Sequence, residues 1–214
     1  MVDSYRHKGL RKKLVEGIRQ KGIMNEEVLE AINRVPRHLF MDSSFINHSY
    51  TDKAFPIGAG QTISQPYTVA FQTELLEAER HLKVLEVGTG SGYQTAVLLE
   101  LGARVYTIER QRELFLEAQR TLSSLHYKPI FFYGDGYEGL PSYAPFDRIL
   151  VTAAAFEIPQ ALLDQLSVGG ILVVPEGGPS GQTMIRVHRV SETEYKRSEH
   201  GLFSFVPLLR GKNN

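Results

Sequence analysis

The sequence predicts an α/β protein in which a mostly parallel sheet is preceded by helices and followed by antiparallel strands. Three observations lead to this fold class. Between residues 83 and 174, short apolar runs alternate with segments of helical periodicity, which is typical of βαβ units and a parallel sheet. Residues 183–208 contain consecutive strand-like runs with no helix between them, whereas residues 5–35 show helical periodicity only.

The N-terminal segment is expected to form two amphipathic helices. Apolar side chains fall at helical spacing in both halves of residues 5–35, and Gly22 separates the halves. Asn25 gives the second helix a capping residue, and Pro36 ends it. Residues 47–66 lose all periodicity, which predicts a long connection without regular structure. A helix then begins at Pro66, with Ser64 or Gln65 as its cap, and continues to Leu76.

The remaining elements follow the alternation directly. Helices are expected from the glycine-rich turn to Leu99, over residues 114–125 and over residues 159–166. The expected strands of the parallel sheet cover residues 83–87, 105–108, 130–133, 146–151 and 171–174, and those of the antiparallel end cover residues 183–190, 194–197 and 202–208.

The composition excludes several classes of protein. The 214 residues carry 24 basic and 24 acidic side chains, a balance that argues against binding to nucleic acid or to an anionic membrane. The absence of cysteine removes disulfides, thiolate metal sites and cysteine nucleophiles, and the seven histidines lack the spacing of metal ligands. No apolar run could span a bilayer, and the charged N-terminus does not match a secretory signal. We therefore expect a soluble cytoplasmic protein without a metal. Because the balanced charge permits a monomer, we also expect the protein to be monomeric.

The strongest local signal is the glycine-rich stretch that follows the strand at residues 83–87. It reads Glu86-Val87-Gly88-Thr89-Gly90-Ser91-Gly92-Tyr93. In a dinucleotide-binding fingerprint the third glycine would stand at the position of Tyr93, and no acid would precede the first glycine at the position of Glu86. Acid-x-Gly-x-Gly-x-Gly instead resembles the first motif of S-adenosylmethionine-dependent methyltransferases. The simpler alternative is an ordinary tight turn between a strand and a helix.

Two further acids follow the next two strands. Glu109 closes the second strand, where a carboxylate can accept hydrogen bonds from both hydroxyls of a ribose. Asp135, followed by Gly136, comes directly after the third strand, and its side chain could accept from the amino group of an adenine. Each acid alone could be a solvated turn residue. Because the carboxyl ends of parallel strands meet at one edge of a sheet, the coincidence of all three favours a nucleoside site there.

The fourth strand ends in Val151-Thr152-Ala153-Ala154-Ala155, a stretch of small residues. Methyltransferases that act on amines or nucleic acids often place a more polar motif at this position. The absence of cysteine also excludes covalent methylation of pyrimidines. The acceptor of a methyl group is therefore expected to arrive ready to react, with little activation from this strand.

Over nearly its whole length the chain resembles the protein-L-isoaspartate (D-aspartate) O-methyltransferases. Gln61-Thr62-Ile63-Ser64-Gln65-Pro66 is specific to that family, whereas the glycine motif is shared by methyltransferases in general. The segments that carry the resemblance are Val35 to Phe40, Pro56 to Pro66, Val84 to Thr95, Gly134 to Gly136, Ala144 to Asp147, Val151 to Ala155 and Phe205 to Leu208.

The resemblance implies a Rossmann-like S-adenosylmethionine-dependent methyltransferase fold and a single domain over residues 1–214. Within it, residues 1–78 would form the helical and substrate-loop region and residues 79–214 the cofactor-binding core. The implied reaction is methyl transfer to the α-carboxyl of L-isoaspartyl residues, and more weakly D-aspartyl residues, in damaged proteins, which starts their repair through a succinimide.

The resemblance also implies roles for individual residues. Ser64 would be the catalytic residue, and Ile57, Ser64 and Val206 would contact the substrate. The implied cofactor contacts are Gln61, Thr62, Ile63, Val69, Glu86, Gly88, Thr89, Gly90, Glu109, Asp135 and Gly136.

The chemistry suits these residues, because a carboxylate is already an anion near neutral pH and needs no general base. Orientation is then the main contribution, and a hydrogen bond from Ser64 could aim one carboxylate oxygen at the methyl group. Two alternatives stay open: a methyltransferase of the same fold that acts on a small carboxylate or hydroxyl metabolite, and a non-catalytic module that senses S-adenosylmethionine. The glycine spacing and the lack of a separate substrate domain disfavour a nicotinamide dehydrogenase.

Overall fold

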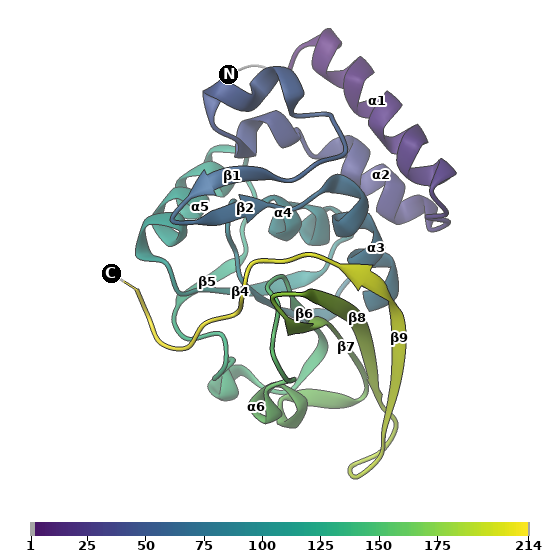
Figure 1. Ribbon diagram of the computed structural model, residues 1–214, viewed down its shortest axis with the longest axis vertical. Helices are drawn as coiled ribbons and strands as arrows, with labels where there is room; N and C mark the ends of the chain where they lie inside the picture. The colour runs from purple at the N-terminus through teal and green to yellow at the C-terminus, as the bar shows by residue number, and fades with distance from the viewer. Residues whose placement is uncertain (1–2, 214) are drawn as a thin grey trace.

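The computed structural model describes residues 3–213, and its centre is a seven-stranded sheet (Figure 1). The strand order is β5-β4-β3-β6-β7-β8-β9, in which the first five strands are parallel and the last two antiparallel. This confirms the predicted fold class. The strands are β3 (Lys83–Val87), β4 (Arg104–Glu109), β5 (Ile130–Tyr133), β6 (Phe146–Val151), β7 (Leu166–Gly178), β8 (Gly181–Arg189) and β9 (Tyr195–Phe203).

Both faces of the sheet are covered, so neighbouring strand residues enter different cores. Val84 packs in a cluster with the N-terminal helices, whereas Leu85, one residue on, packs in a second cluster on the opposite face. The order of the strands reverses between β3 and β6, the position at which open α/β sheets bind ligands. The helices are α1 (Tyr5–Gln20), α2 (Glu26–Arg34), α3 (Pro66–Leu76), α4 (Tyr93–Glu100), α5 (Arg112–Ser124) and α6 (Gln160–Asp164), with short 3₁₀ helices η1 (Arg37–Phe40), η2 (Ser43–His48) and η3 (Pro141–Tyr143).

The N-terminal helices form as the sequence predicts. The side chain of Asn25 accepts hydrogen bonds from the backbone N–H groups of Glu27 and Val28, which satisfies two donors at the start of α2. The helix ends at Arg34, before Pro36. None of the helices in residues 3–213 is both long and apolar enough to cross a membrane.

The expectation that residues 47–66 lack regular structure is wrong. They contain the end of η2 and an antiparallel hairpin of β1 (Phe55–Gly58) and β2 (Gln61–Ile63). Ala59 and Gly60 form the turn, with φ angles of 47° and 67°. These strands of three and four residues are too short to show an alternating pattern, so only the turn residues could have indicated the hairpin.

The prediction of three separate C-terminal strands is also wrong, because residues 181–203 form two strands, β8 and β9. Residues 194–197 and the start of 202–208 belong to one strand, β9, which pairs with β8 through a shift of register near Ile185. Residues after Phe203 leave the sheet and run beside Ala154, which donates to the carbonyl of Val206 and accepts from the N–H of Leu208. Strand β7 is longer than expected and helix α6 is shorter.

Candidate active site

The glycine-rich loop between β3 and α4 lies tightly against the end of β6. Gly88 has a φ of 99°, and a Cβ atom at this position would lie 2.5 Å from the Oγ1 atom of Thr152. The Thr152 hydroxyl in turn donates to the carbonyl of Gly88 at 2.6 Å. Glycine is therefore required both for the turn and for the contact with the neighbouring strand. Thr152 had no predicted role, although it is the one polar side chain in the stretch Val151 to Ala155.

Glu109 ends β4 beside this loop, as the sequence predicts. Its carboxylate accepts hydrogen bonds from the backbone N–H groups of Gly90 at 2.9 Å and of Gln111 at 2.8 Å. Because an ionised carboxylate has about four acceptor sites, these two bonds orient the group and leave capacity for two donors from a ligand. A pair of ribose hydroxyls is such a set of donors.

Glu86 lies beneath the loop and lines none of the cavities described below. Its side chain is fully buried and accepts from the hydroxyls of Thr95 and Thr107, and the Thr107 hydroxyl contacts that of Thr89 at 2.6 Å. Burial raises the pKa of Glu86 to about 7. In residues 3–213 its second oxygen, Oε1, has no hydrogen-bond partner. The position suits a support for Thr89 more directly than a ligand contact.

Asp135 and Gly136 have different surroundings. The Asp135 carboxylate accepts from the backbone N–H of Tyr137 at 2.8 Å and from that of Gly211, in the C-terminal segment, at 2.6 Å. Gly136 lines a cavity, and a Cβ atom there would lie 2.5 Å from Cγ1 of Val87. Of this predicted pair, only Gly136 faces the space that a ligand could enter.

Three connected hollows follow the carboxyl ends of the strands. We call them the side cavity, the central cavity and the groove. The side and central cavities share Gln61, Gly88, Glu109 and Ala153, and the central cavity and the groove share Thr62, Ser64, Thr152 and Val206. Ten predicted site residues line the central cavity, namely Gln61, Thr62, Ile63, Ser64, Val69, Gly88, Thr89, Gly90, Glu109 and Val206.

The hollows differ in size and in lining. The side cavity is largely apolar, with Val87, Ile108 and Leu208 among its walls. The groove has a volume of about 1020 Å³ and runs between α3 and the β9 end of the sheet, past Tyr67, Phe71 and other aromatic side chains. Ile57 lines neither the central cavity nor the groove but a separate hollow near Gly90, so its contact with a substrate stays a prediction.

Ser64 stands where the central cavity opens into the groove. It follows β2 directly and precedes α3, so the hairpin and the helix fix its backbone from both sides. Its side chain does not cap α3; the capping position is Gln65, whose side chain makes no capping bond either. Within residues 3–213 the Ser64 hydroxyl has no hydrogen-bond partner, so it is available to a ligand.

Asp52 performs the capping of α3 from a distance, a role that the sequence did not indicate. Its Oδ1 atom accepts from the N–H of Tyr67 at 2.8 Å, and its Oδ2 atom accepts from the side chain of Gln65 at 3.1 Å. The same Oδ2 atom pairs with the ammonium group of Lys21, at the end of α1. Asp52 thereby connects α1 to Gln65 and Tyr67, which lie one and three residues after Ser64.

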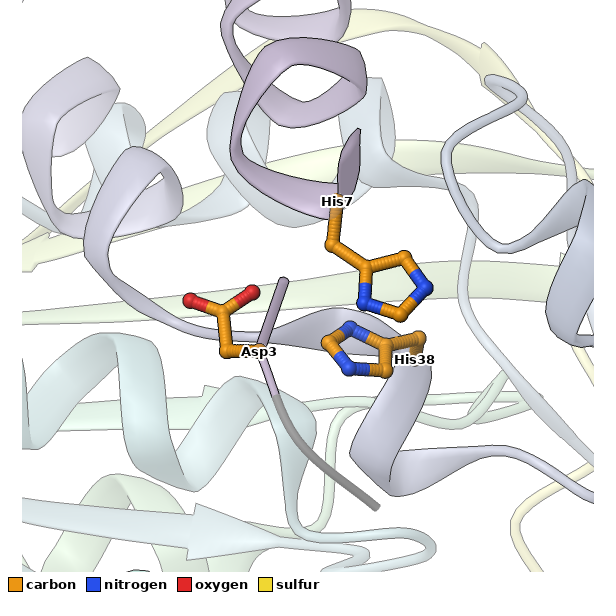
Figure 2. Close-up of side chains that lie close together, drawn as sticks. All are labelled: Asp3, His7 and His38. Atoms are coloured by element: carbon orange, nitrogen blue, oxygen red, sulfur yellow. The ribbon is translucent and has the colours of Figure 1, made fainter. Parts of the chain in front are cut away.

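A second cluster of titratable groups lies at the N-terminus (Figure 2). Asp3, His7 and His38 each offer an atom within 4.8 Å of the others, a proximity that the sequence spacing did not suggest. However, the Nδ1 atoms of both rings already have partners: that of His7 accepts from the N–H of Ser4 at 3.4 Å, and that of His38 is 2.7 Å from the hydroxyl of Tyr50. The Asp3 carboxylate is bound by both terminal nitrogens of Arg11. This geometry fits a structural contact between α1 and η1 better than a metal site.

The sheet order, the glycine loop and the acid at the end of β4 together define a Rossmann-like methyltransferase. The sequence model of the family described as protein-L-isoaspartate(D-aspartate) O-methyltransferase (PCMT) matches residues 9–213. A protein-L-isoaspartate O-methyltransferase from Christiangramia forsetii is 60% identical over 214 residues, the full length of both chains. The chain therefore belongs to the protein-L-isoaspartate(D-aspartate) O-methyltransferase family, which confirms the resemblance found in the sequence.

Solved structures agree with this assignment. A solved protein-L-isoaspartate O-methyltransferase, 27% identical, superposes with a TM-score of 0.84 over 92% of this chain and 65% of the solved chain. A protein from Plasmodium falciparum, described as a beta-aspartate methyltransferase in complex with S-adenosyl-L-homocysteine, has a TM-score of 0.82 at 23% identity over 93% of this chain and 98% of its own. The second likeness supports the fold alone.

Proposed function

We propose that this chain transfers a methyl group from S-adenosylmethionine to the α-carboxyl of L-isoaspartyl residues, and more weakly D-aspartyl residues, in damaged proteins. The methyl ester would then form a succinimide, whose hydrolysis returns part of the damaged population to aspartate. The observation that carries the proposal is the place of Ser64: its hydroxyl, which has no partner among the described residues 3–213, lies at the junction of the central cavity and the groove.

The residues that line the two smaller cavities suit the parts of S-adenosylmethionine. The apolar side cavity suits an adenine, and Glu109, on the wall shared with the central cavity, suits the ribose. The central cavity then takes the methionine part, with Ser64 at its open end. When bound, S-adenosylmethionine supplies an electrophilic methyl group. Gly88 and Gly136 allow the backbone to approach closely, since any side chain there would meet Thr152 or Val87.

The groove suits a polypeptide. Its volume of about 1020 Å³ exceeds what one side chain needs, and its walls combine Tyr67 and Phe71 with residues 200–206. The isoaspartyl α-carboxylate would enter the junction already ionised, so no general base is needed. Ser64 would donate a hydrogen bond to one oxygen of this carboxylate and direct the other along the axis of the transferring methyl group.

The two parts of the domain would share this work. Residues 1–78 provide Lys21, Ser64, Tyr67 and Phe71 to the groove, and residues 79–214 provide Gly88, Glu109 and Gly136 to the cofactor cavities. In this proposal the domain acts as a monomer on proteins and not on nucleic acid. Light scattering of the purified protein tests the monomer directly.

The proposal is tested with twin peptides that differ only in one residue, isoaspartate in one and aspartate in the other. With labelled S-adenosylmethionine we expect base-labile methyl incorporation into the isoaspartyl peptide alone. Equal labelling of both peptides, or labelling of neither, would reject the repair function. Labelling of small carboxylates in place of peptides would favour a metabolite methyltransferase of the same fold.

A further inference from the structure

The C-terminal segment crosses the ligand-binding edge of the sheet. After β9 the chain passes Ala154, at the end of β6, and continues past the ends of β4 and β5, as the yellow segment in Figure 1 shows. We call residues 207–213 the C-terminal strap. Pro207, Leu208 and Leu209 line the side cavity, and Leu208 is buried. The strap is therefore a wall of the cavity that we assign to adenine.

The far end of the strap is held by the strand ends themselves. Asn213 exchanges backbone hydrogen bonds with residues after β4: its N–H donates to Arg110 at 2.9 Å and its carbonyl accepts from Arg112 at 3.0 Å. The hydroxyl of Tyr133, at the end of β5, donates to the same carbonyl at 3.1 Å. These contacts hold the end of the strap on the rim of the sheet.

Two charged side chains hold its middle. The guanidinium of Arg110 donates to the carbonyls of Gly211 at 2.9 Å and Arg210 at 3.3 Å. Asp135 accepts from the N–H of Gly211 at 2.6 Å, a bond assisted by its charge. The guanidinium of Arg210 lies 4.2 Å from the centroid of the Tyr137 ring, two residues after Asp135.

We propose that Asp135 and Arg110 are positioning residues that hold the C-terminal strap as the outer wall of the adenine pocket, and that Asp135 acts on the cofactor through the strap. The inference rests on the proposed function, because it takes S-adenosylmethionine as the occupant of the side cavity. It changes the predicted role of Asp135, whose carboxylate was expected to contact the adenine amino group itself. In the structure Asp135 does not line the side cavity, whereas its carboxylate accepts from the backbone N–H of Gly211 in the strap.

The test compares Asp135→Asn with a matched control, Asp42→Asn. Asp42 accepts from the N–H of Ser44, two residues on, as Asp135 does from Tyr137, but it makes no bond to the strap. First, hydrogen–deuterium exchange of peptides covering residues 207–213 is measured without ligand. We expect about tenfold faster exchange in Asp135→Asn and no change in Asp42→Asn, because the amide cannot accept both backbone bonds with its NH₂ group.

The second measurement is the affinity for S-adenosylhomocysteine and for the analogue whose 6-amino group is replaced by hydrogen. We expect Asp135→Asn to weaken both ligands by the same factor, about tenfold. If Asp135 instead bonded directly to the amino group, Asp135→Asn would weaken S-adenosylhomocysteine but not the analogue that lacks this group. That result would overturn the inference, as would faster exchange of the strap with unchanged affinity, or unchanged exchange in Asp135→Asn.

Arg110→Met provides an independent variant in case Asp135→Asn folds poorly. It removes two bonds to the strap without touching Asp135, and we expect the same pairing of faster exchange and weaker binding of both ligands. Failure of the unchanged protein to bind S-adenosylhomocysteine would contradict the proposed function itself. That outcome is separate from a failure of the strap, because it needs no variant to be seen.

Discussion

Replacing Glu86 by glutamine should change how the stability of the protein depends on pH. Burial raises the pKa of Glu86 from 4.5 to about 7 in the folded protein. A tenfold change in proton affinity is worth about 1.4 kcal/mol, so this shift corresponds to about 3 kcal/mol. Below pH 4.5 the carboxyl is protonated in both states and contributes no penalty. As the pH rises to 7 the unfolded chain loses the proton first, so the free energy of unfolding falls, and the full penalty is present above pH 7.

The glutamine variant does not titrate and avoids this penalty. We therefore expect the free energy of unfolding of Glu86→Gln, relative to the unchanged protein, to rise by about 3 kcal/mol between pH 4.5 and pH 8. Urea denaturation at several pH values measures it. Glu117→Gln is a control that removes the same charge from an exposed position on α5. If the free energy of unfolding depends on pH in the same way in Glu86→Gln and Glu117→Gln, the pKa of Glu86 is not raised by burial in the folded protein.

Three further predictions concern the proposed site. Ser64→Ala should lower turnover roughly a hundredfold while the affinity for S-adenosylhomocysteine stays within about twofold, because only the orienting bond is lost. The control is Ser124→Ala, at the exposed end of α5. Loss of cofactor binding in Ser64→Ala would show that Ser64 has a structural role instead. Glu109→Gln should weaken cofactor binding by about ten- to a hundredfold in calorimetry, and unchanged affinity would contradict its contact with the ribose. Asp52→Ala should lower the free energy of unfolding by about 1 kcal/mol and slow turnover, since the N–H of Tyr67 loses its capping bond. An unchanged melting temperature and unchanged turnover would show that this bond does not position Ser64.

The central part of the fold was predictable because its signals are local. Strands β3, β5 and β6 occupy the residues expected from the alternation of apolar runs and helices. The meeting of Gly88, Glu109 and Gly136 follows from the rule that parallel strands present their carboxyl ends at one edge. The hairpin of β1 and β2 could not be found in the same way, because its strands are too short to show a period.

The roles of individual acids were harder to predict, because side-chain partners far apart in the sequence decide them. Glu86 and Asp135 stand at the expected edge, but Glu86 turns beneath the loop toward Thr107, and Asp135 binds Gly211, 76 residues away. Asp52 caps α3 across 15 residues without any local capping motif. The sequence identifies which acids lie at the edge, and long-range packing determines which of them face the cavity.

In the proposed complex the adenosine lies in the side cavity and the methyl donor lies in the central cavity, facing Ser64. A crystal structure of the protein with S-adenosylhomocysteine and an isoaspartyl peptide would show whether both are bound in this way. We expect adenine beside Ile108 and Leu208, ribose hydroxyls on Glu109, the sulfur in the central cavity, and the peptide's α-carboxylate within hydrogen-bond distance of the Ser64 hydroxyl. An adenine bound elsewhere, or a carboxylate held away from Ser64, would contradict the proposed complex.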